Sequence, residues 1–441
     1  MSGLRARRTV SVGGVVWRYE RTEEIGEKGD EISGEGRWRL SSPNVGANAA
    51  YEIRCATDAD LDDHAKMLEQ GYGYPPPYGA RHADMIRAAG LTHRVFGAYE
   101  RGRLLATLTQ FPFGQFFGGR PVPMGGIGAV VVLPEHRGRG IASTMLEHAV
   151  NTMRDHGEVV SALGPATIGV YRRAGWELAG DRCWYSIVTR ALDSLDISIA
   201  QERRAVRGDH DSMKRVYLRW ASIHPGYLAR PAYLWDRRLD LDVGSYCYVA
   251  TRNDAVVGYV IYTQRRSRAG YSIIVDDIAA LDWDAERCLW RHLGAHRAQA
   301  TSVVIQGLVP DALLLHLPEE SLSIVHQHQW MLRILDVRGA VAARGFNVGV
   351  AGTLAFHLSD PLVEANNGLW TLAIADGRGV ITPGGSGSVE ISINGLAALY
   401  SGMHSARTLA TNGFIHGATP DQLGLFDGAF GGPRPSMSDD F

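Results

Sequence analysis

The sequence is poor in cysteine and lysine and has no large excess of charge of either sign. Its cysteines, Cys55, Cys183, Cys247 and Cys288, lie far apart and include no C-x-x-C pair. This argues against a zinc site or a disulfide framework, so no metal is expected, and it favours a reducing compartment. With three lysines, many arginines and a formal net charge of −2, the chain has no global basic field that would attract nucleic acid.

Long apolar segments are also missing. No run approaches 18 consecutive apolar residues, and the N-terminus has no hydrophobic leader. A hydrophobic content of 45% and a charged content of 21% are typical of globular proteins outside membranes. We therefore expect a cytoplasmic protein without membrane partners.

The length of 441 residues exceeds what one hydrophobic core usually supports, so two to four domains are expected. Changes in pattern along the chain predict an N-terminal extension, two α/β units and a C-terminal α+β unit. Their predicted limits are residues 1–48, 49–192, 193–336 and 337–441. The extension holds candidate strands at Thr9–Tyr19 and Gly36–Leu40, and we interpret it as an arm that packs on a neighbouring domain or subunit.

The most informative segment is GAVVVLPEHRGRGIASTML, at residues 128–146. The apolar run Ala129–Leu133 predicts a buried strand that ends at Pro134. R-G-R-G-I-A follows at residues 137–142, and helical spacing of apolar residues begins at Ile141. Glycines at a helix start leave backbone amides uncovered, and a helix N-terminus attracts anions. The segment therefore suits a pyrophosphate.

Other phosphate-binding motifs fit less well. The segment lacks the GK[ST] ending of a nucleoside triphosphate loop, and it lacks G-x-G-x-x-G with a following acid. An ordinary strand–turn–helix unit with an exposed basic turn stays open as an alternative.

The two α/β units follow similar orders of elements. The first is predicted to contain strands at 51–55, 94–99, 104–111 and 159–163, and a short helix at 168–174. The second is predicted to contain helices at 209–223 and 283–296, and strands at 246–251, 256–263 and 302–308. At the place that matches the glycine loop, the second unit has Ala280-Leu281-Asp282-Trp283. We interpret it as a duplicated domain that has lost its cofactor.

Several segments carry a family resemblance: VVVLPEHRGRG at 130–140, VYRRAGW at 170–176, HPGYLARPAYLWD at 224–236, WMLRILDVRGAVAARGF at 330–346 and LYSGMHSARTLA at 399–410. With them, the chain resembles the Eis family of GCN5-related N-acetyltransferases (GNAT). The resemblance implies two tandem GNAT domains, the second degenerate, and a C-terminal domain like sterol carrier protein 2. It also implies acetyl transfer from acetyl-CoA to a primary amine, and assembly as a homo-hexamer.

The resemblance also assigns roles to individual residues. The cofactor-binding set comprises Val130, Val131, Val132, Arg137, Gly138, Arg139, Gly140, Ile141 and Ala142. Tyr171 is expected to protonate the departing thiolate, because a phenol is a reasonable donor to a thiolate. The terminal carboxylate of Phe441 is expected to accept the proton of the amine, with Asp440 as a substrate contact. This predicts that the C-terminal tail lies inside the protein.

The acceptor side departs from the family pattern. Where relatives carry acidic residues, this chain has GYGYPPPY at 71–78, which is aromatic and uncharged. Tyr74, Phe117 and Ala129 are therefore predicted to contact the acceptor. We expect a small molecule, either aminoglycoside-like or another cationic or aromatic amine. Two alternatives stay open: a protein lysine as acceptor, or a non-catalytic lipid-binding or scaffold protein.

Overall fold

The computed structural model describes residues 51–240, 244–268, 270–307, 311–317 and 319–441, and three N-terminal strands. Those strands are β1 (Arg5–Val12), β2 (Val15–Thr22) and β3 (Arg39–Leu40), which form an antiparallel sheet. Two strands therefore occur where one was predicted at Thr9–Tyr19. Most of the charged stretch between the predicted strands lies outside the described residues. Residues before 53 form a compact unit of their own.

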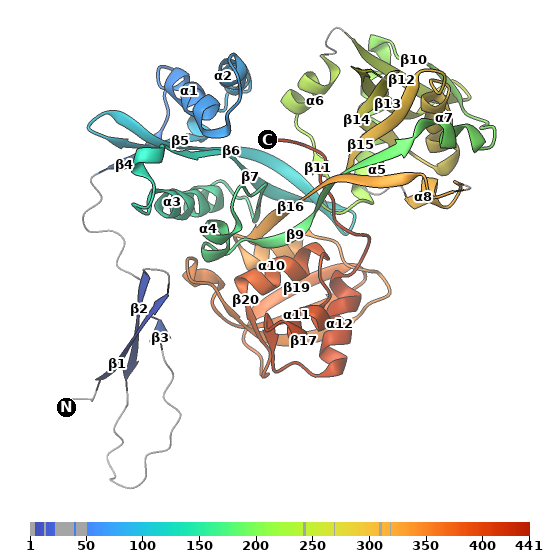
Figure 1. Ribbon diagram of the computed structural model, residues 1–441. Coiled ribbons are helices and arrows are strands. Elements are labelled where there is room, and N and C mark those ends of the chain that lie inside the picture. Colours follow the sequence, from blue (N-terminus) through green and yellow to red (C-terminus); the bar gives the residue numbers. More distant parts are fainter. Residues whose placement is uncertain are drawn as a thin grey trace. The chain divides into compact units, whose positions relative to one another are not determined.

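The first domain is built on a long hairpin of two strands, β6 and β7. The turn between them uses Gly118 and Gly119, whose φ angles of 57° and 81° suit the tight turns that join strands. Helices cover the sheet, so most of β6 is buried (Figure 1). The elements are β4 (Glu52–Cys55), α1 (Leu61–Tyr72), α2 (Tyr78–Ala88), β5 (Val95–Glu100), β6 (Arg103–Phe117), β7 (Arg120–Val132), α3 (Ile141–Asp155), β8 (Val160–Leu163), α4 (Ile168–Arg173) and β9 (Glu177–Val188).

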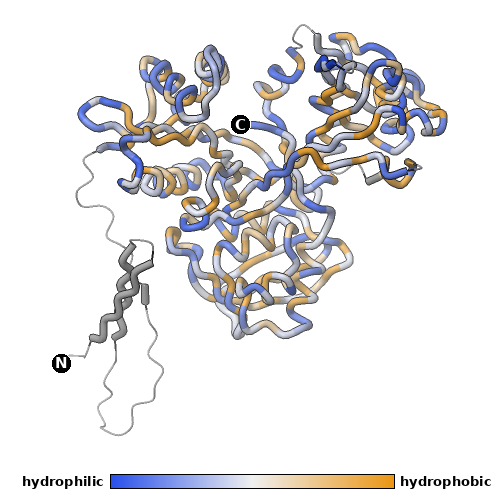
Figure 2. Tube along the Cα trace, in the orientation of Figure 1, coloured by the Kyte–Doolittle hydropathy of each residue, from blue (hydrophilic) through white to orange (hydrophobic). Residues whose placement is uncertain are grey.

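The second domain repeats this order of strands and helices. Its elements are β10 (Gln201–Arg204), α5 (His210–Ser222), β11 (Leu228–Ala229), α6 (Ala232–Leu239), β12 (Ser245–Arg252), β13 (Ala255–Ser267), β14 (Gly270–Ala280), α7 (Trp283–Gly294), β15 (Ala300–Gly307), α8 (Asp311–Leu314) and β16 (Leu322–Ile334). As in the first domain, a hairpin of long strands leads into a parallel strand pair with a helix between its members. Apolar residues recur along these central strands (Figure 2).

The two domains share one continuous sheet. Its strand order is β10-β12-β13-β14-β15-β9-β16-β8-β7-β6-β5-β4. Strand β16, the last of the second domain, lies between β8 and β9 of the first and pairs with both. Strand β9 in turn pairs with β15. Each domain therefore completes the sheet of the other.

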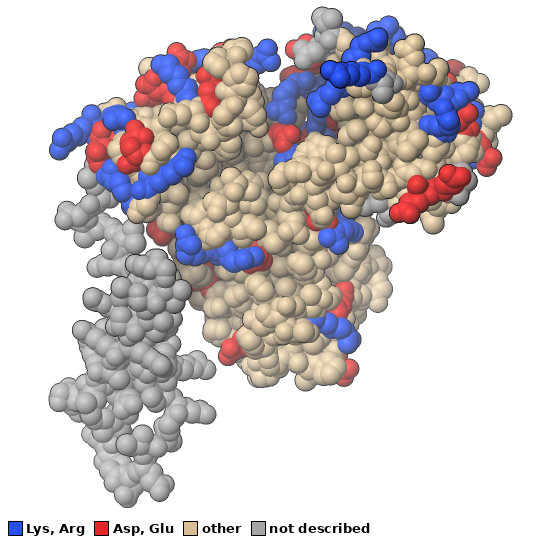
Figure 3. All heavy atoms as spheres, viewed as in Figure 1, with Lys and Arg blue, Asp and Glu red and all other residues tan. Residues whose placement is uncertain are grey.

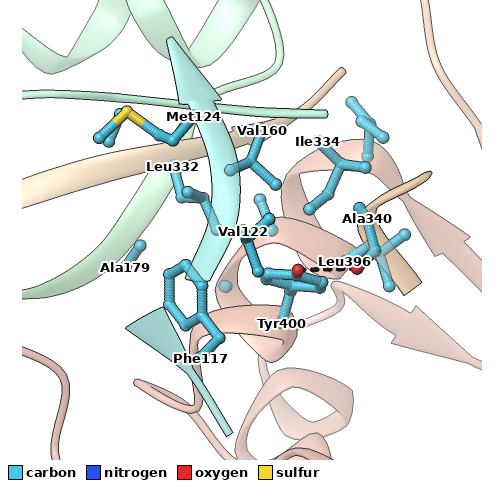
Figure 4. Packing of buried hydrophobic residues seen from close by; sticks show 14 of the residues in the cluster. Phe117, Val122, Met124, Val160, Ala179, Leu332, Ile334, Ala340, Leu396 and Tyr400 are labelled. Atoms are coloured by element: carbon cyan, nitrogen blue, oxygen red, sulfur yellow. Dashed lines mark hydrogen bonds between the residues drawn. The ribbon is translucent and has the colours of Figure 1, made fainter. Parts of the chain in front are cut away.

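The third domain is an α+β unit with its own five-stranded sheet. Its elements are α9 (Val337–Ala343), β17 (Gly352–Ser359), β18 (Gly368–Ala375), β19 (Arg378–Pro383), β20 (Glu390–Ser392), α10 (Ile393–Ser401), α11 (Ala406–Thr411), β21 (Ile415–His416) and α12 (Pro420–Phe430). It is anchored at the turn end of the β6–β7 hairpin, where Phe117 packs edge-on against Tyr400 with ring centroids 5.2 Å apart (Figure 4). The Tyr400 hydroxyl donates to the carbonyl oxygen of Ala340 at 2.8 Å.

Charged residues of both signs are interspersed over the visible face of the described residues (Figure 3). No helix among the described residues is both long and apolar enough to span a membrane.

Candidate active site

The main cavity of the first domain opens where two parallel strands separate. Strands β7 and β8 pair from Met124 opposite Val160 to Ile127 opposite Leu163. Beyond that point, residues 128–130 of one strand and 164–166 after the other line a cavity of about 660 Å³. Diverging parallel strands expose backbone groups that a ligand can reach, and this volume is typical of small-molecule sites.

A β-bulge shapes the wall of this cavity. Thr107 and Thr109 of β6 oppose Val131 and Gly128, so that two residues of β7, Ala129 and Val130, face one residue of β6. Ala129 has a φ of 55°, in the left-handed region that non-glycine residues rarely occupy. A bulge leaves its extra residue outside the ladder of hydrogen bonds, and bulges are frequent beside active sites. Both bulge residues line the cavity.

The glycine loop lies directly before α3. Gly138 and Gly140 have φ angles of 77° and 78°, and a Cβ at either position would have open space around it, so the backbone conformation and not crowding requires glycine. Gly140 occupies the N-cap of α3 without a side-chain cap, which leaves the first helical amides to other partners. Arg139 Nη2 lies 2.7 Å from Glu100 Oε1, and Arg137 Nε donates to the Val132 carbonyl at 3.2 Å. This exposed, cationic helix start fits a pyrophosphate.

Tyr171 points into the same cavity from α4. Its side chain is buried, and its hydroxyl has no hydrogen-bond partner among the described residues. Burial raises the pKa of Tyr171 above its ordinary value, so the phenol stays protonated at neutral pH. Its hydroxyl hydrogen is therefore present at neutral pH and not engaged by another described residue.

The C-terminal tail runs as an extended strap (Figure 1). Its residues Met437 and 439–441 line this cavity. The amide of Asp181 in β9 donates to the Pro435 carbonyl at 3.0 Å, and the Ser436 amide donates to the Pro225 carbonyl at 3.0 Å. The strap thus runs between β9 and the loop before β11. Tails without such contacts usually fray.

A buried ion-pair network fixes the tail near its end. Arg230 Nε lies 3.0 Å from both carboxylate oxygens of Asp439, and Arg238 Nη2 lies 3.1 Å from Oδ1. Arg230 also holds Asp277 through two hydrogen bonds of 2.6 and 3.0 Å. Burial disfavours the charged form of Asp439, but the two arginines outweigh it and hold the pKa of that carboxyl below its ordinary value. The network ties the tail to the second domain.

The last two residues end beside the bulge. The Asp440 side chain pairs with Arg182 of β9, and Arg237 Nη2 donates to the Asp440 carbonyl at 3.0 Å. The Phe441 ring packs against Phe113, with ring centroids 4.9 Å apart. A Cβ on Gly128 would lie 2.7 Å from a terminal oxygen of Phe441, so glycine at this position allows the carboxylate to approach β7.

Aromatic side chains form the outer wall of the cavity. Tyr74 lies between Tyr78 and Tyr72, with ring centroids 4.2 and 6.0 Å away, and all three side chains are partly exposed. The Tyr72 hydroxyl donates to the Val130 carbonyl at 3.4 Å. This is the aromatic segment singled out in the sequence, and it borders the cavity.

Unpartnered polar atoms lie among the apolar lining. His82 Nε2, Tyr233 Oη and Trp330 Nε1 are buried without a hydrogen-bond partner among the described residues. Burial, aided by the positive charge of Arg237, lowers the pKa of His82 to about 4, so this imidazole is neutral at pH 7. Buried polar groups normally have partners, so these atoms are available to an acceptor or to water.

The structure brings some of the predicted site residues together in this cavity. Six line the cavity: Tyr74, Ala129, Val130, Tyr171, Asp440 and Phe441. The side chains of Val131 and Ile141 are buried in the core, which leaves only their backbone for a ligand.

One predicted contact lies elsewhere. Phe117 packs in the core against Tyr400 and does not line the cavity, so its predicted contact with the acceptor is wrong. The predicted strand ends at residue 111, and Phe117 was expected just beyond it, near the cavity. The hairpin extends farther than predicted, however, and carries Phe117 to the third domain.

Several cavity residues were not predicted. Arg182, Arg237, Tyr233 and the tail residue Asp439 line the cavity. The adjacent acids at the end of the chain and the arginine-rich segment after residue 229 were the available signals. Neither signal shows which charges meet, because the partners are far apart in the sequence.

Comparisons with known proteins match each of the three domains. Models of the acetyltransferase (GNAT) domain match residues 52–179 and 226–334, and a model of the sterol carrier protein domain matches residues 337–438. N-acetyltransferase Eis of Mycobacterium tuberculosis is 28% identical over 334 residues, which cover 71% of this chain and 79% of that protein.

Solved structures agree over a larger share of the chain. A GCN5-related N-acetyltransferase from Anabaena variabilis is 31% identical with a TM-score of 0.84, covering 89% of this chain and all of that one. Another from Kribbella flavida is 33% identical with a TM-score of 0.79, covering 89% of this chain and 99% of that one.

Proposed function

Because the chain belongs to the GCN5-related N-acetyltransferases, in the Eis arrangement of two GNAT domains and a sterol carrier protein domain, we propose that it acetylates the primary amine of a small molecule with an aromatic or apolar body. The observation that carries this proposal is one cavity that contains the β-bulge, the Tyr171 hydroxyl, the terminal carboxylate and a wall of tyrosines.

Backbone and loop residues of the first domain would hold acetyl-CoA. Val130 and Val132 offer strand-edge amides and carbonyls to the pantetheine arm, and residues 137–142 offer helix-start amides and two guanidinium groups to the pyrophosphate. A free amide at the bulge is suited to stabilise negative charge on the thioester oxygen. Losing one such donor typically costs about 3 kcal/mol of barrier.

Two protein groups would move the protons. The Phe441 carboxylate accepts a proton from the acceptor ammonium, which leaves the neutral amine free to attack the thioester carbon. As the carbon–sulfur bond breaks, Tyr171 donates its proton to the sulfur, and the second proton lost by the attacking nitrogen restores the Tyr171 phenol. The products are an amide and the free thiol, and the Phe441 carboxyl returns its proton to solvent. Holding both reactants in one cavity can supply roughly 7–11 kcal/mol of the barrier.

The charges of the cavity favour a singly charged amine over a polycation. The acids that line the cavity are Asp439, which Arg230 and Arg238 neutralise, Asp440 and the terminal carboxylate. Arg182 pairs with the Asp440 side chain, and Arg237 donates to the Asp440 carbonyl. The neighbouring His82 is neutral at pH 7. The tyrosine wall offers ring faces to an aromatic body and to a single ammonium group.

The test is free-thiol release from acetyl-CoA with a panel of amines: tyramine, spermidine, kanamycin and a lysine peptide. We expect the highest kcat/KM with tyramine. The Tyr74→Ala variant should raise the KM for tyramine and leave the KM for acetyl-CoA unchanged. A preference for kanamycin or for the peptide would refute the proposed acceptor class, and the peptide result would support a protein lysine acceptor instead. Family membership also predicts a homo-hexamer, which light scattering on the purified protein would test.

A further inference from the structure

A second cavity occupies the corresponding place in the second domain. Strands β14 and β15 are parallel and pair from Tyr271 opposite Ala300 to Val275 opposite Ile305. Past this point, residues 275–280 and 305–307 line a cavity of about 640 Å³. The fold therefore produces a second cleft of ligand-binding size at a second pair of diverging strands.

This second cleft is poorly suited to acetyl-CoA. Asp282 occupies the N-cap of α7, and its carboxylate accepts a hydrogen bond from the Ala285 amide at 3.0 Å. Asp284 and Glu286 add two further acids in the first turn of the helix. Arg252 and Arg287 pair with Asp282 and Asp284, and the Asp282 carboxylate fills the N-cap where a phosphate would bind. This helix start therefore lacks the open amides of the first domain.

One of these acids faces the cavity without a cationic partner. Glu286 lines the cavity, and Oε1 accepts a hydrogen bond from Trp290 Nε1 at 3.0 Å. No described cation pairs with it, and burial raises the pKa of this carboxyl above its ordinary value. A half-buried carboxylate without a counter-charge is costly, and a cationic ligand would relieve that cost.

Aromatic rings surround the same space. Trp220, Tyr227, Tyr185 and Trp290 line the cavity, and the rings of Trp220 and Tyr227 lie at 82° to one another with centroids 4.6 Å apart. Gln306 adds a buried Nε2 without a hydrogen-bond partner among the described residues. Aromatic faces together with a carboxylate are the usual means of recognising an organic ammonium group.

We propose that the cavity between β14 and β15 binds an organic ammonium ion with an aromatic or apolar body, with Glu286 as its counter-charge. This site is separate from the acceptor cavity, and the proposal does not depend on which amine is acetylated.

Isothermal titration calorimetry on the full chain tests this proposal, with benzyltrimethylammonium as the probe. This cation has no N–H and cannot be acetylated, and benzyl alcohol serves as its neutral counterpart. We expect the cation to bind in the millimolar range or tighter and the alcohol to bind more weakly. The Glu286→Gln variant should bind the cation about tenfold more weakly or worse. The same substitution at Glu320, an exposed residue outside the cavity, should have no effect.

A second variant protects the test against a folding defect. Ile223 lies at the mouth of the cavity with its side chain 67% exposed, so Ile223→Arg should fold normally. Its positive charge should also weaken binding of the cation. Wild-type affinity in both variants would place the probe in the acceptor cavity and overturn the proposal, as would failure of the wild-type protein to bind the cation.

Discussion

Asp439 offers a sharp test of the tail as part of the active site. Its carboxylate is almost fully buried and meets Arg230 and Arg238 at 3.0 and 3.1 Å. Substituting Asp439→Asn removes the charge and leaves Arg238 without this partner. Breaking a buried ion pair in this way costs about 3–5 kcal/mol. At about 1.4 kcal/mol per tenfold, the docking equilibrium of the tail falls by roughly two to four powers of ten.

The consequence for catalysis follows from the position of Phe441, two residues farther along. We expect kcat/KM for acetyl transfer to fall by about 10²-fold or more, because the carboxylate leaves the cavity and general-base assistance is lost. Free-thiol release measures the rate, and fluorescence titration measures acetyl-CoA affinity. That affinity should stay near the wild-type value, since residues 137–142 are not part of the tail network.

The matched control is Asp421→Asn, an exposed aspartate at the start of α12, which should behave as the wild type. Wild-type turnover in Asp439→Asn would refute the reasoning that this ion pair holds the catalytic carboxylate. Equal loss of acetyl-CoA binding would show that the substitution unfolds the first domain as well.

Three further predictions concern the acid, the loop and pH. Tyr171→Phe should lower kcat by about 10²–10⁴-fold with unchanged acetyl-CoA affinity, and turnover near wild type would remove Tyr171 from the mechanism. Arg139→Gln should weaken the binding of acetyl-CoA about tenfold in the same titration. The melting temperature should change little because the ion pair of Arg139 with Glu100 is partly exposed to solvent. Unchanged affinity for acetyl-CoA would count against a pyrophosphate at this loop. His64 and His82 are held by burial at a pKa of about 4, below the ordinary 6.5, so the unfolded chain binds more protons between these values. The free energy of unfolding, measured by urea denaturation, should therefore reach its full value above pH 6.5 and fall toward pH 4. An unchanged free energy of unfolding between pH 7 and pH 5 would contradict this prediction.

Much of the first domain could be predicted because its signals are local. The strand, the glycine loop and α3 follow one another directly, so the pattern at residues 128–146 identifies all three. Tyr171 lies in a short motif of the same kind. The placement of Phe441 rested on the family resemblance alone, since a tail rich in glycine, proline and serine otherwise predicts disorder.

The parts that escaped prediction depend on distant partners. Arg230 and Asp439 are ordinary charged residues in the sequence, and only the folded chain shows that they pair in the interior. Phe117 is an aromatic residue of the kind that often contacts a substrate, but the length of β6 determines where it lies. The end of a strand depends on what the sheet packs against, which the local sequence does not show.

The insertion of β16 between β8 and β9 also bears on how the protein is made. Until residue 334 has left the ribosome, β8 and β9 have no strand between them and present unpaired edges, which are prone to bind other chains. The sheet of the first domain therefore cannot be completed until the second domain has been translated, and until then its open edges favour association with other chains. A fragment that ends after β9 would remain in that incomplete state, so the smallest independently folding acetyltransferase unit of this chain extends at least to β16.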